Sequence, residues 1–383
     1  MAVDATSTQP GGGQSYLSQQ LRLAEMDDLD LTIFATRETA MTWSSLIGAR
    51  VELVPTQRIL RVAYVHLCLS YIAKRRGATV LYCPGSVAPL FSSLPRVILI
   101  QNPHLFVSPA PRSARLTALR VLSWSSVLRS TLVGVQTRQM CCEFRRHSGL
   151  AIVPIVVRSG FGAIYHPTPE RLERLDSDGQ YLLTVSNLYA YKRIDLTIRA
   201  YAILSDSVRK RWRLIIAGAE GSRGIAAKLQ ALVIKLGVQE EVVFMGFVEK
   251  EELAALYSKA SLYVNLSSRE SLGLTPAEAL VHGTPVLLSD IPVFRETYGT
   301  WANFSTCKDP SSVALDIERS LSEGRRVDLV NARKQFDSNG KEIRRLLELA
   351  SRKGIPSLAT VIMRVRIRPA AALRVILGTK GVS

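Results

Sequence analysis

Residues 262–289 read LYVNLSSRESLGLTPAEALVHGTPVLLS and are the most informative part of the sequence. It begins with a short apolar run at 262–266, passes through a polar loop that contains Gly273, and takes on helical spacing over 276–282. A second apolar run follows at 285–289. Two short apolar runs joined by a helix are typical of a parallel strand–helix–strand unit.

The same alternation extends along the rest of the second half. We predict further strands at 181–186, 212–217 and 242–244, and helices near 195–204, 225–236, 250–258 and 311–322. This order favours a doubly wound parallel sheet, which binds ligands at the carboxyl ends of its strands. Those ends fall at 186–187, 218–219, 246–248, 267–270 and 289–290.

The first half alternates less regularly. We predict strands at 29–35, 51–54, 79–82, 97–101 and 151–158, helices at 60–74 and 112–133, and a glycine loop at 11–13 that leads into a helix. Residues 1–8 make a poor strand, so the start of this sheet is expected to be incomplete.

The length indicates two domains, because 383 residues exceed the size at which one core usually stops growing. We predict a first Rossmann-like domain at 1–165, a polar, proline-containing linker at 166–180 and a second Rossmann-like domain at 181–335. A C-terminal helix and a basic tail would occupy 336–383.

The formal charge of +17 predicts a phosphate-bearing or anionic partner. No acidic residue occurs between Leu53 and Cys142, where eleven lysines and arginines fall. For the basic helix at 112–133, the first interpretation is a packed helix with one solvated face. For the tail at 351–383, it is a solvated chain end. The second interpretation of both segments is binding to an anionic membrane surface. The five cysteines form neither a disulfide framework nor a metal motif, and no secretory signal is evident, which favours the cytoplasm.

Two glutamates stand eight residues apart across the glycine-containing loop of the opening stretch. Glu270 follows a predicted strand, and Glu278 lies in the first turn of the next helix, so both can point into one crevice. Carboxylates accept hydrogen bonds from sugar hydroxyls, and backbone N–H groups of the loop and helix donate to phosphates. Glu278 has an equally good structural explanation, a capping box with Thr275 as N-cap.

This segment, with the following His282-Gly283-Thr284-Pro285-Val286, resembles the signature of glycosyltransferase family 4, whose members have the GT-B fold and retain anomeric configuration. The resemblance implies two Rossmann-like domains that face a cleft. It also implies that Glu270 contacts the donor sugar and that Glu278 binds the nucleotide ribose.

A second part of the resemblance lies at 182–195, where family members carry a lysine at the position of Lys192. The resemblance implies that Lys192 neutralises the donor diphosphate as negative charge develops on the leaving group, with Arg193 as second choice. Many members have an arginine where this chain has Asn187, so part of the usual diphosphate clamp differs here.

The remaining matches extend the implied donor and acceptor sites. Gly12 and Gly13 resemble the family's N-terminal glycine loop, Phe247 and Val248 a turn beside the nucleobase, and Gly273, Leu274 and Thr275 the loop that meets the donor. On the acceptor side, Gln101 aligns with a family histidine near the reacting centre, and the neighbouring Asn102 and His104 are further candidates.

Together these features predict a retaining glycosyltransferase that moves a hexose or deoxyhexose from a nucleotide sugar to a glycan or lipid-linked acceptor in cell-surface polysaccharide biosynthesis. No cofactor or metal is expected, because Lys192 and helix N-terminal amides can neutralise the diphosphate. The alternatives are another sugar-nucleotide enzyme on the same fold, such as an epimerase, and a noncatalytic phosphate- or nucleic-acid-binding protein. Nucleic acid is the weaker partner, because no recognisable nucleic-acid module accompanies the charge.

Overall fold

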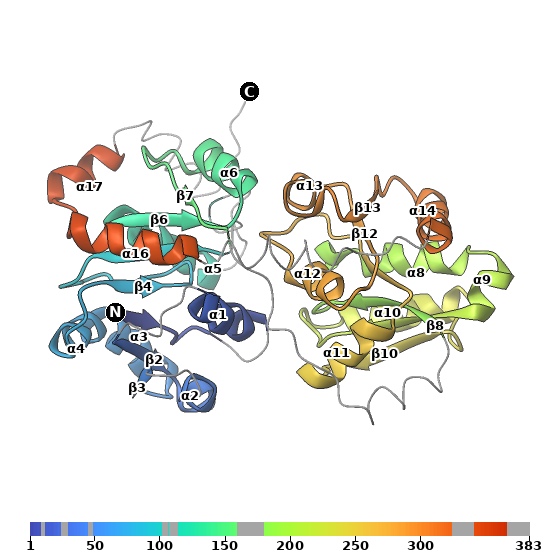
Figure 1. The fold of residues 1–383 in the computed structure, drawn as a ribbon, viewed down its shortest axis with the longest axis horizontal. Coiled ribbons are helices and arrows are strands. Elements are labelled where there is room, and N and C mark those ends of the chain that lie inside the picture. The colour runs from blue at the N-terminus through green and yellow to red at the C-terminus, as the bar shows by residue number, and fades with distance from the viewer. Residues whose placement is uncertain are drawn as a thin grey trace. The chain divides into compact units, whose positions relative to one another are not determined.

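The computed structural model describes residues 1–8, 12–23, 30–44, 49–101, 106, 114–158, 180–323 and 341–365. The chain divides into two compact units (Figure 1). The first combines Met1–Gly160 with Phe336–Ser383, and the second is the continuous segment Phe161–Gln335. The predicted linker at 166–180 lies outside the described residues, except for Gln180, which begins a strand.

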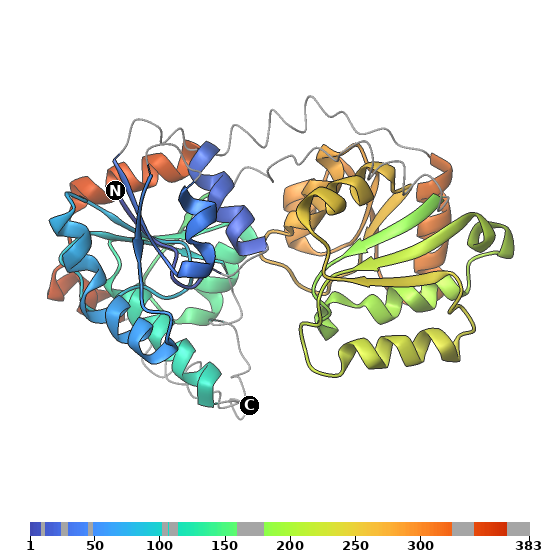
Figure 2. The same ribbon diagram turned by 90° about the horizontal axis from the view of Figure 1, so that it is seen from below.

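The second unit is a six-stranded parallel sheet in the order β10-β9-β8-β11-β12-β13. Its strands are β8 Gln180–Val185, β9 Trp212–Ala217, β10 Val242–Gly246, β11 Leu262–Asn265, β12 Val286–Ser289 and β13 Ala302–Ser305. Its helices are η3 Ala190–Lys192, α8 Ile194–Ala202, α9 Asp206–Arg211, α10 Ile225–Lys235, α11 Lys250–Lys259, α12 Leu274–Val281, α13 Pro292–Tyr298 and α14 Pro310–Glu323. Helices cover both faces of the sheet (Figure 2), which explains why the strands are apolar along nearly their whole length.

The first unit is a seven-stranded parallel sheet in the order β3-β2-β1-β4-β5-β6-β7. Its strands are β1 Ala2–Asp4, β2 Leu31–Ala35, β3 Ala49–Leu53, β4 Leu81–Cys83, β5 Arg96–Ile100, β6 Leu132–Val135 and β7 Ile155–Val156. Its helices are α1 Gly12–Leu23, α2 Arg37–Ser44, α3 Arg58–Leu67, α4 Leu69–Arg75, α5 Ala114–Arg129, α6 Arg138–Ser148, α16 Lys341–Lys353 and α17 Leu358–Val365.

Three predictions for the first unit were wrong. The start of the chain does form a strand: β1 pairs with β2 and β4 in the middle of the sheet. The helix predicted at 60–74 is two helices that meet at Cys68, where φ is −110°. The helix predicted at 112–133 ends at Arg129, because β6 begins at Leu132 and pairs with β5.

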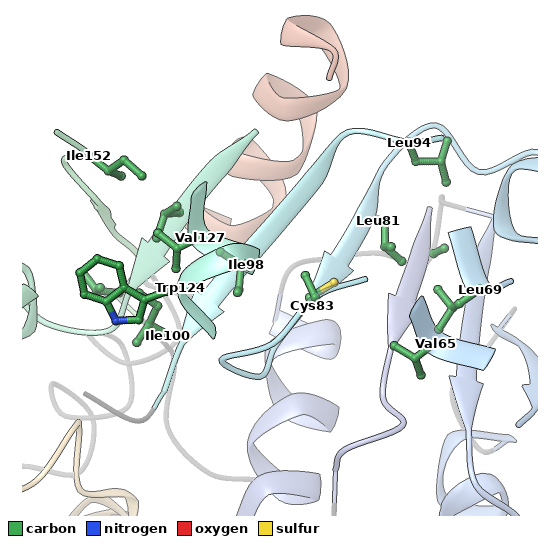
Figure 3. Packing of buried hydrophobic residues seen from close by; sticks show 14 of the residues in the cluster. Val65, Leu69, Leu81, Cys83, Leu94, Ile98, Ile100, Trp124, Val127 and Ile152 are labelled. Atoms are coloured by element: carbon green, nitrogen blue, oxygen red, sulfur yellow. The ribbon is translucent and has the colours of Figure 1, made fainter. Parts of the chain in front are cut away.

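The core of the first unit explains the role of α5. Trp124 and Val127 of this helix point toward Ile98 and Ile100 of β5 (Figure 3), and both are almost fully buried. Arg120 of the same helix is also fully buried. Burial of Trp124 and Val127 stabilises the packing of α5 against the sheet, so α5 is foremost a core helix.

The C-terminal segment completes the first unit. The apolar face of α16 is buried there through Ile343, Leu346, Leu347 and Ala350. Beyond it, the Arg364 guanidinium of α17 donates to the carbonyls of Leu128 at 2.8 Å and Ser130 at 2.6 Å, at the end of α5. These bonds satisfy helix C-terminal carbonyls that would otherwise lack partners. No helix in the described ranges combines the length and apolar character needed to cross a bilayer.

Candidate functional site

The candidate site lies at the carboxyl edge of the second unit's sheet. The strand order reverses between β8 and β11, which are neighbours in the sheet but not in the sequence. The carboxyl ends of two such strands are the usual ligand position in this type of sheet. Lys192 follows β8, and Glu270 follows β11.

An ion pair joins the two loops. Lys192 Nζ lies 2.5 Å from Glu270 Oε1, and the exposed fractions of the two side chains are only 15% and 11%. The backbones beneath are also linked, since the Ser268 amide donates to the Tyr191 carbonyl at 2.8 Å. A cation and a carboxylate are thus held together at the position where the strand order reverses. Charged groups fixed before a ligand arrives act more strongly than groups that must reorganise.

Glu278 lies on α12 and accepts a hydrogen bond from the Tyr257 hydroxyl at 2.9 Å. Tyr257 comes from α11, and its ring stacks on His282, whose Nδ1 is 2.7 Å from the Glu278 carbonyl oxygen. Burial raises the pKa of the Glu278 carboxyl, while the Tyr257 hydrogen bond acts in the opposite direction. The carboxyl is therefore held in position at an energetic cost, as is common for groups that serve a ligand.

The capping-box explanation of Glu278 was wrong. Helix α12 begins at Leu274, its N-cap is Gly273, and no side chain caps it. The Thr275 hydroxyl accepts instead from the Tyr263 hydroxyl at 2.7 Å. Glu278 consequently has no role in capping the helix, and its carboxylate is directed to Tyr257.

Gly273 forms a tight turn at the start of α12. Its φ is 79°, and an added Cβ would lie 2.6 Å from the ring of Phe294. Its carbonyl accepts a hydrogen bond from the Tyr298 hydroxyl. The loop that leads from Glu270 to the amides of Leu274 and Thr275 is thus fixed by packing on one side and hydrogen bonding on the other.

The tyrosines around this loop were not predicted from the sequence. Tyr257, Tyr263 and Tyr298 come from three different elements, and their rings are nearly or fully buried. The available signal was a buried tyrosine in an apolar strand, because a buried hydroxyl usually finds a partner. That signal does not reveal which group the tyrosine hydroxyl bonds.

Two other predicted donor-site residues, Arg193 and Asn187, lie in different surroundings from Lys192. Arg193 has a left-handed backbone, with φ at 51°, and its guanidinium donates to the Cys307 carbonyl at 3.2 Å, beyond β13. Asn187 is exposed after β8, and its carbonyl accepts from the Ser186 hydroxyl. The structure brings Lys192, Glu270 and the α12 start together, whereas Arg193 is bonded to the end of a different strand.

The other predicted residues are distributed over both units. Phe247, 62% exposed, and Val248 follow β10 in the second unit. In the first unit, Gly12 and Gly13 begin α1, and Gln101 directly follows β5. Asn102 and His104 lie outside the described residues.

No cluster of three or more histidine, cysteine or acidic side chains suited to a metal occurs among the described residues. The chain has two Asp-x-Asp sequences, at 28–30 and 176–178. Only Asp30 of these is described, and it lies in the first unit, exposed before β2. The cation that lies against Glu270 is Lys192.

Glu278→Gln should stabilise the protein at neutral pH. Because burial raises the pKa of Glu278 above its ordinary 4.5, the folded state binds the proton more tightly than the unfolded state. This carboxyl therefore lowers the free energy of unfolding progressively as pH rises from about 4.5 through its folded pKa. We expect Glu278→Gln to raise the free energy of unfolding at pH 7.5 by about 0.5–1 kcal/mol, with little change near pH 4.

Thermal unfolding at both pH values measures this difference. The matched control is Glu251→Gln on α11, where the side chain is exposed. An equal gain in both variants, or a gain at pH 4 as large as at pH 7.5, would contradict a cost specific to the buried carboxyl.

Comparisons with known proteins agree with this geometry. The family model described as glycosyl transferases group 1 matches residues 170–343. An uncharacterized glycosyltransferase of Methanocaldococcus jannaschii is 34% identical over 42% of this chain and 41% of its own length. The O-antigen chain mannosyltransferase RfbU of Salmonella typhimurium is also 34% identical, over 41% of this chain and 44% of its own length. The match thus spans less than half the length of these two relatives.

A longer match and solved structures extend the comparison to both units. The D-inositol 3-phosphate glycosyltransferase of Acidothermus cellulolyticus is 31% identical over 84% of this chain and 80% of its own length. Anabaena HepE, solved with UDP and glucose, superimposes with a TM-score of 0.65 at 17% identity, over 92% of this chain and 97% of its own. Sucrose-phosphate synthase of Thermosynechococcus elongatus superimposes with a TM-score of 0.66 at 18% identity, over 92% of this chain and 96% of its own.

These structural neighbours are GT-B glycosyltransferases, and this chain has the same pair of Rossmann-like parallel sheets, so the predicted fold class is confirmed. The long match to the Acidothermus enzyme shows that the relationship is not limited to the second unit. The chain belongs to the group 1 glycosyltransferases.

Proposed function

We propose that the protein is a retaining glycosyltransferase of family 4 that transfers a hexose or deoxyhexose from a nucleotide sugar to a glycan or lipid-linked acceptor. The observation that carries the proposal is the Lys192–Glu270 pair, held 2.5 Å apart where the strand order reverses, with Glu278 on the helix that follows. A sugar nucleotide needs these groups: a cation for the diphosphate and carboxylates for hydroxyls.

In this proposal each residue has a separate task. Glu270 accepts hydrogen bonds from donor sugar hydroxyls, and Glu278 accepts them from the ribose. Lys192 neutralises the diphosphate together with the backbone amides of Leu274 and Thr275 at the start of α12. Phe247 is exposed at the end of β10 and offers a surface for the nucleobase.

The proposed reaction proceeds on one face of the sugar. The bond between the anomeric carbon and the diphosphate oxygen breaks as the acceptor oxygen bonds to that carbon. The acceptor proton passes to the departing diphosphate. Configuration is retained without a protein nucleophile, and Lys192 stabilises the charge on the leaving group, so no metal or cofactor is required in this scheme.

The acceptor is proposed from charge and from a relative. The Salmonella relative is named as an O-antigen chain mannosyltransferase, and the first unit has no acidic residue between Leu53 and Cys142. Both favour a role in cell-surface polysaccharide biosynthesis, with the protein in the cytoplasm at an anionic membrane surface that carries the acceptor.

A thermal-shift screen with UDP, GDP, dTDP and their common sugar conjugates tests the donor. A ligand at about 100 times its Kd should raise the free energy of unfolding by about 2.7 kcal/mol, because it binds only the folded state. We expect one nucleotide family to raise the Tm, and Glu278→Ala to abolish that rise. EDTA should leave the rise unchanged. No response to any nucleotide would contradict the proposal.

A further inference from the structure

Helix α3 of the first unit presents an unusually apolar face to solvent. The exposed fraction is 84% for Ile59, 53% for Leu60, 47% for Val62 and 65% for Leu67. These positions share one side of a helix, and most large apolar side chains of a helix would be turned to a core. Contiguous exposed apolar surface on a soluble domain marks an interaction site more often than chance packing.

The opposite side of the same helix is the one that the fold uses. Val65 of α3 and Leu69 of α4 point toward Leu81 of β4 within the core (Figure 3). The core thus fixes which way α3 faces. The exposed side chains of α3 are not part of this core cluster, so core packing does not explain why they are apolar.

The apolar face continues onto a neighbouring loop and helix. The His66 Nδ1 accepts from the Leu90 amide at 3.1 Å, and the Ser70 hydroxyl donates to the Phe91 carbonyl at 3.3 Å. These bonds hold Phe91, 63% exposed, against the junction of α3 and α4. Tyr71 of α4 is 56% exposed, and the Arg75 guanidinium lies 5.5 Å from the centre of its ring.

Positive charge borders this face. Arg58, Lys74 and Arg75 are exposed on α3 and α4. Arg76 is also exposed and pairs with Glu52 at 2.8 Å, and Glu52 precedes the span that contains no acidic residue. An apolar surface bordered by cations and by a tyrosine matches a bilayer, where apolar side chains enter the acyl region and cations meet anionic headgroups.

We propose that the α3–α4 face, defined by Ile59, Leu60, Val62, Leu67, Tyr71 and Phe91, docks the protein on an anionic lipid bilayer. This surface differs from the segments that the sequence indicated for membrane contact. Trp124 on α5 is buried in the core, and residues 366–383 of the tail lie outside the described residues. The role of this docking rests on the proposed function, because it would bring the enzyme to a membrane-bound acceptor. The binding itself requires neither donor nor acceptor.

Co-sedimentation with vesicles tests the surface directly. We expect the full chain to bind vesicles of equal parts phosphatidylcholine and phosphatidylglycerol at low salt, and to bind phosphatidylcholine alone much more weakly. The double variant Ile59→Ser/Leu67→Ser should lower partitioning by at least about tenfold, since two inserted side chains are returned to water. Arg58→Gln/Arg75→Gln should lower it only for the anionic vesicles and mainly at low salt.

The matched controls lie on α10 of the second unit. Ile234 is 68% exposed there, and Lys228 and Lys235 are exposed as well. Ile234→Ser and Lys228→Gln/Lys235→Gln should bind vesicles as the parent does. All these positions are exposed, so thermal unfolding should be unchanged in every variant and report intact folding.

Three outcomes would overturn the proposal: no binding of the parent chain to anionic vesicles, equal losses in the α10 controls, or a parent dimer that Ile59→Ser/Leu67→Ser dissociates in sedimentation velocity. The last would make the face an interface between copies of the chain. The nucleotide thermal shift, measured on the same proteins, keeps the two proposals apart. Vesicle binding without any nucleotide response would refute the transferase proposal alone, and the reverse would refute the docking surface alone.

Discussion

Lys192→Met is expected to lower the rate of sugar transfer by about 10²- to 10³-fold, the usual loss when one preorganised group that stabilises developing negative charge is removed. Lys192 is the cation held beside Glu270 at the reversal of strand order. In the proposed reaction its charge matters most in the transition state, when the diphosphate becomes a leaving group, so the loss should fall mainly on kcat. The rate is measured as nucleoside diphosphate released from the donor that stabilises the parent protein.

Two variants separate this effect from a general loss of charge. Lys210→Met removes an exposed lysine from α9 of the same unit and should leave the rate unchanged. Lys192→Arg keeps the charge but changes its geometry, so it should retain part of the activity. If Lys192→Met keeps its unfolding temperature and transfers sugar at a rate close to that of the parent, Lys192 has no part in catalysis.

Gly218→Ala is expected to produce the largest loss of stability. Gly218 follows β9 with φ at 146°, and an added Cβ would lie 1.9 Å from the Ser186 carbonyl oxygen. Its amide also donates to the Gly246 carbonyl, which ties the ends of β9 and β10 together. The backbone cannot move aside as a side chain can. We therefore expect Gly218→Ala to lower the free energy of unfolding by roughly 3 kcal/mol or more. The corresponding fall in Tm is about 6–12 °C.

Gly237→Ala is the matched control for this substitution. Gly237 also has a positive φ, 69°, but an added Cβ there meets nothing within 4 Å. Gly237→Ala should lower the free energy of unfolding by only about 1 kcal/mol, which is the penalty of the left-handed conformation itself. Similar losses in the two variants, measured by thermal unfolding, would mean that the contact with Ser186 relaxes without strain.

Most of the second unit was predicted from the sequence because its local signals agree, although α9, α13 and the edge strand β13 were missed. The strand predicted at 212–217 coincides with β9 Trp212–Ala217, and the helix predicted at 225–236 differs by one residue from α10 Ile225–Lys235. The strand β1 Ala2–Asp4 was missed, because three residues give no periodicity. Its burial comes from pairing with β2 and β4, which only tertiary structure provides.

The candidate site was predictable in part. The spacing of Glu270 and Glu278 around a loop places both at one sheet edge, and the structure holds Lys192 against Glu270. The hydrogen bond from Tyr257 to Glu278 joins residues 21 apart in the sequence, and no local pattern reveals such a contact. Arg193 follows Lys192 in the sequence, but this does not reveal where its side chain points. The left-handed backbone at Arg193 turns the side chain to the Cys307 carbonyl.

The return of the C-terminal helices to the first unit sets the order in which the protein can mature on the ribosome. The second unit is one continuous segment, so its whole sheet is available once Gln335 has emerged. The first unit, although synthesised first, must wait for α16 and α17, whose Leu346 and Leu347 are buried and whose Arg364 bonds the end of α5. Domains usually finish in the order of synthesis. Here the nascent N-terminal sheet keeps an uncovered apolar face until α16 and α17 have emerged, so a chain stalled or truncated before them would carry one finished half and one aggregation-prone half.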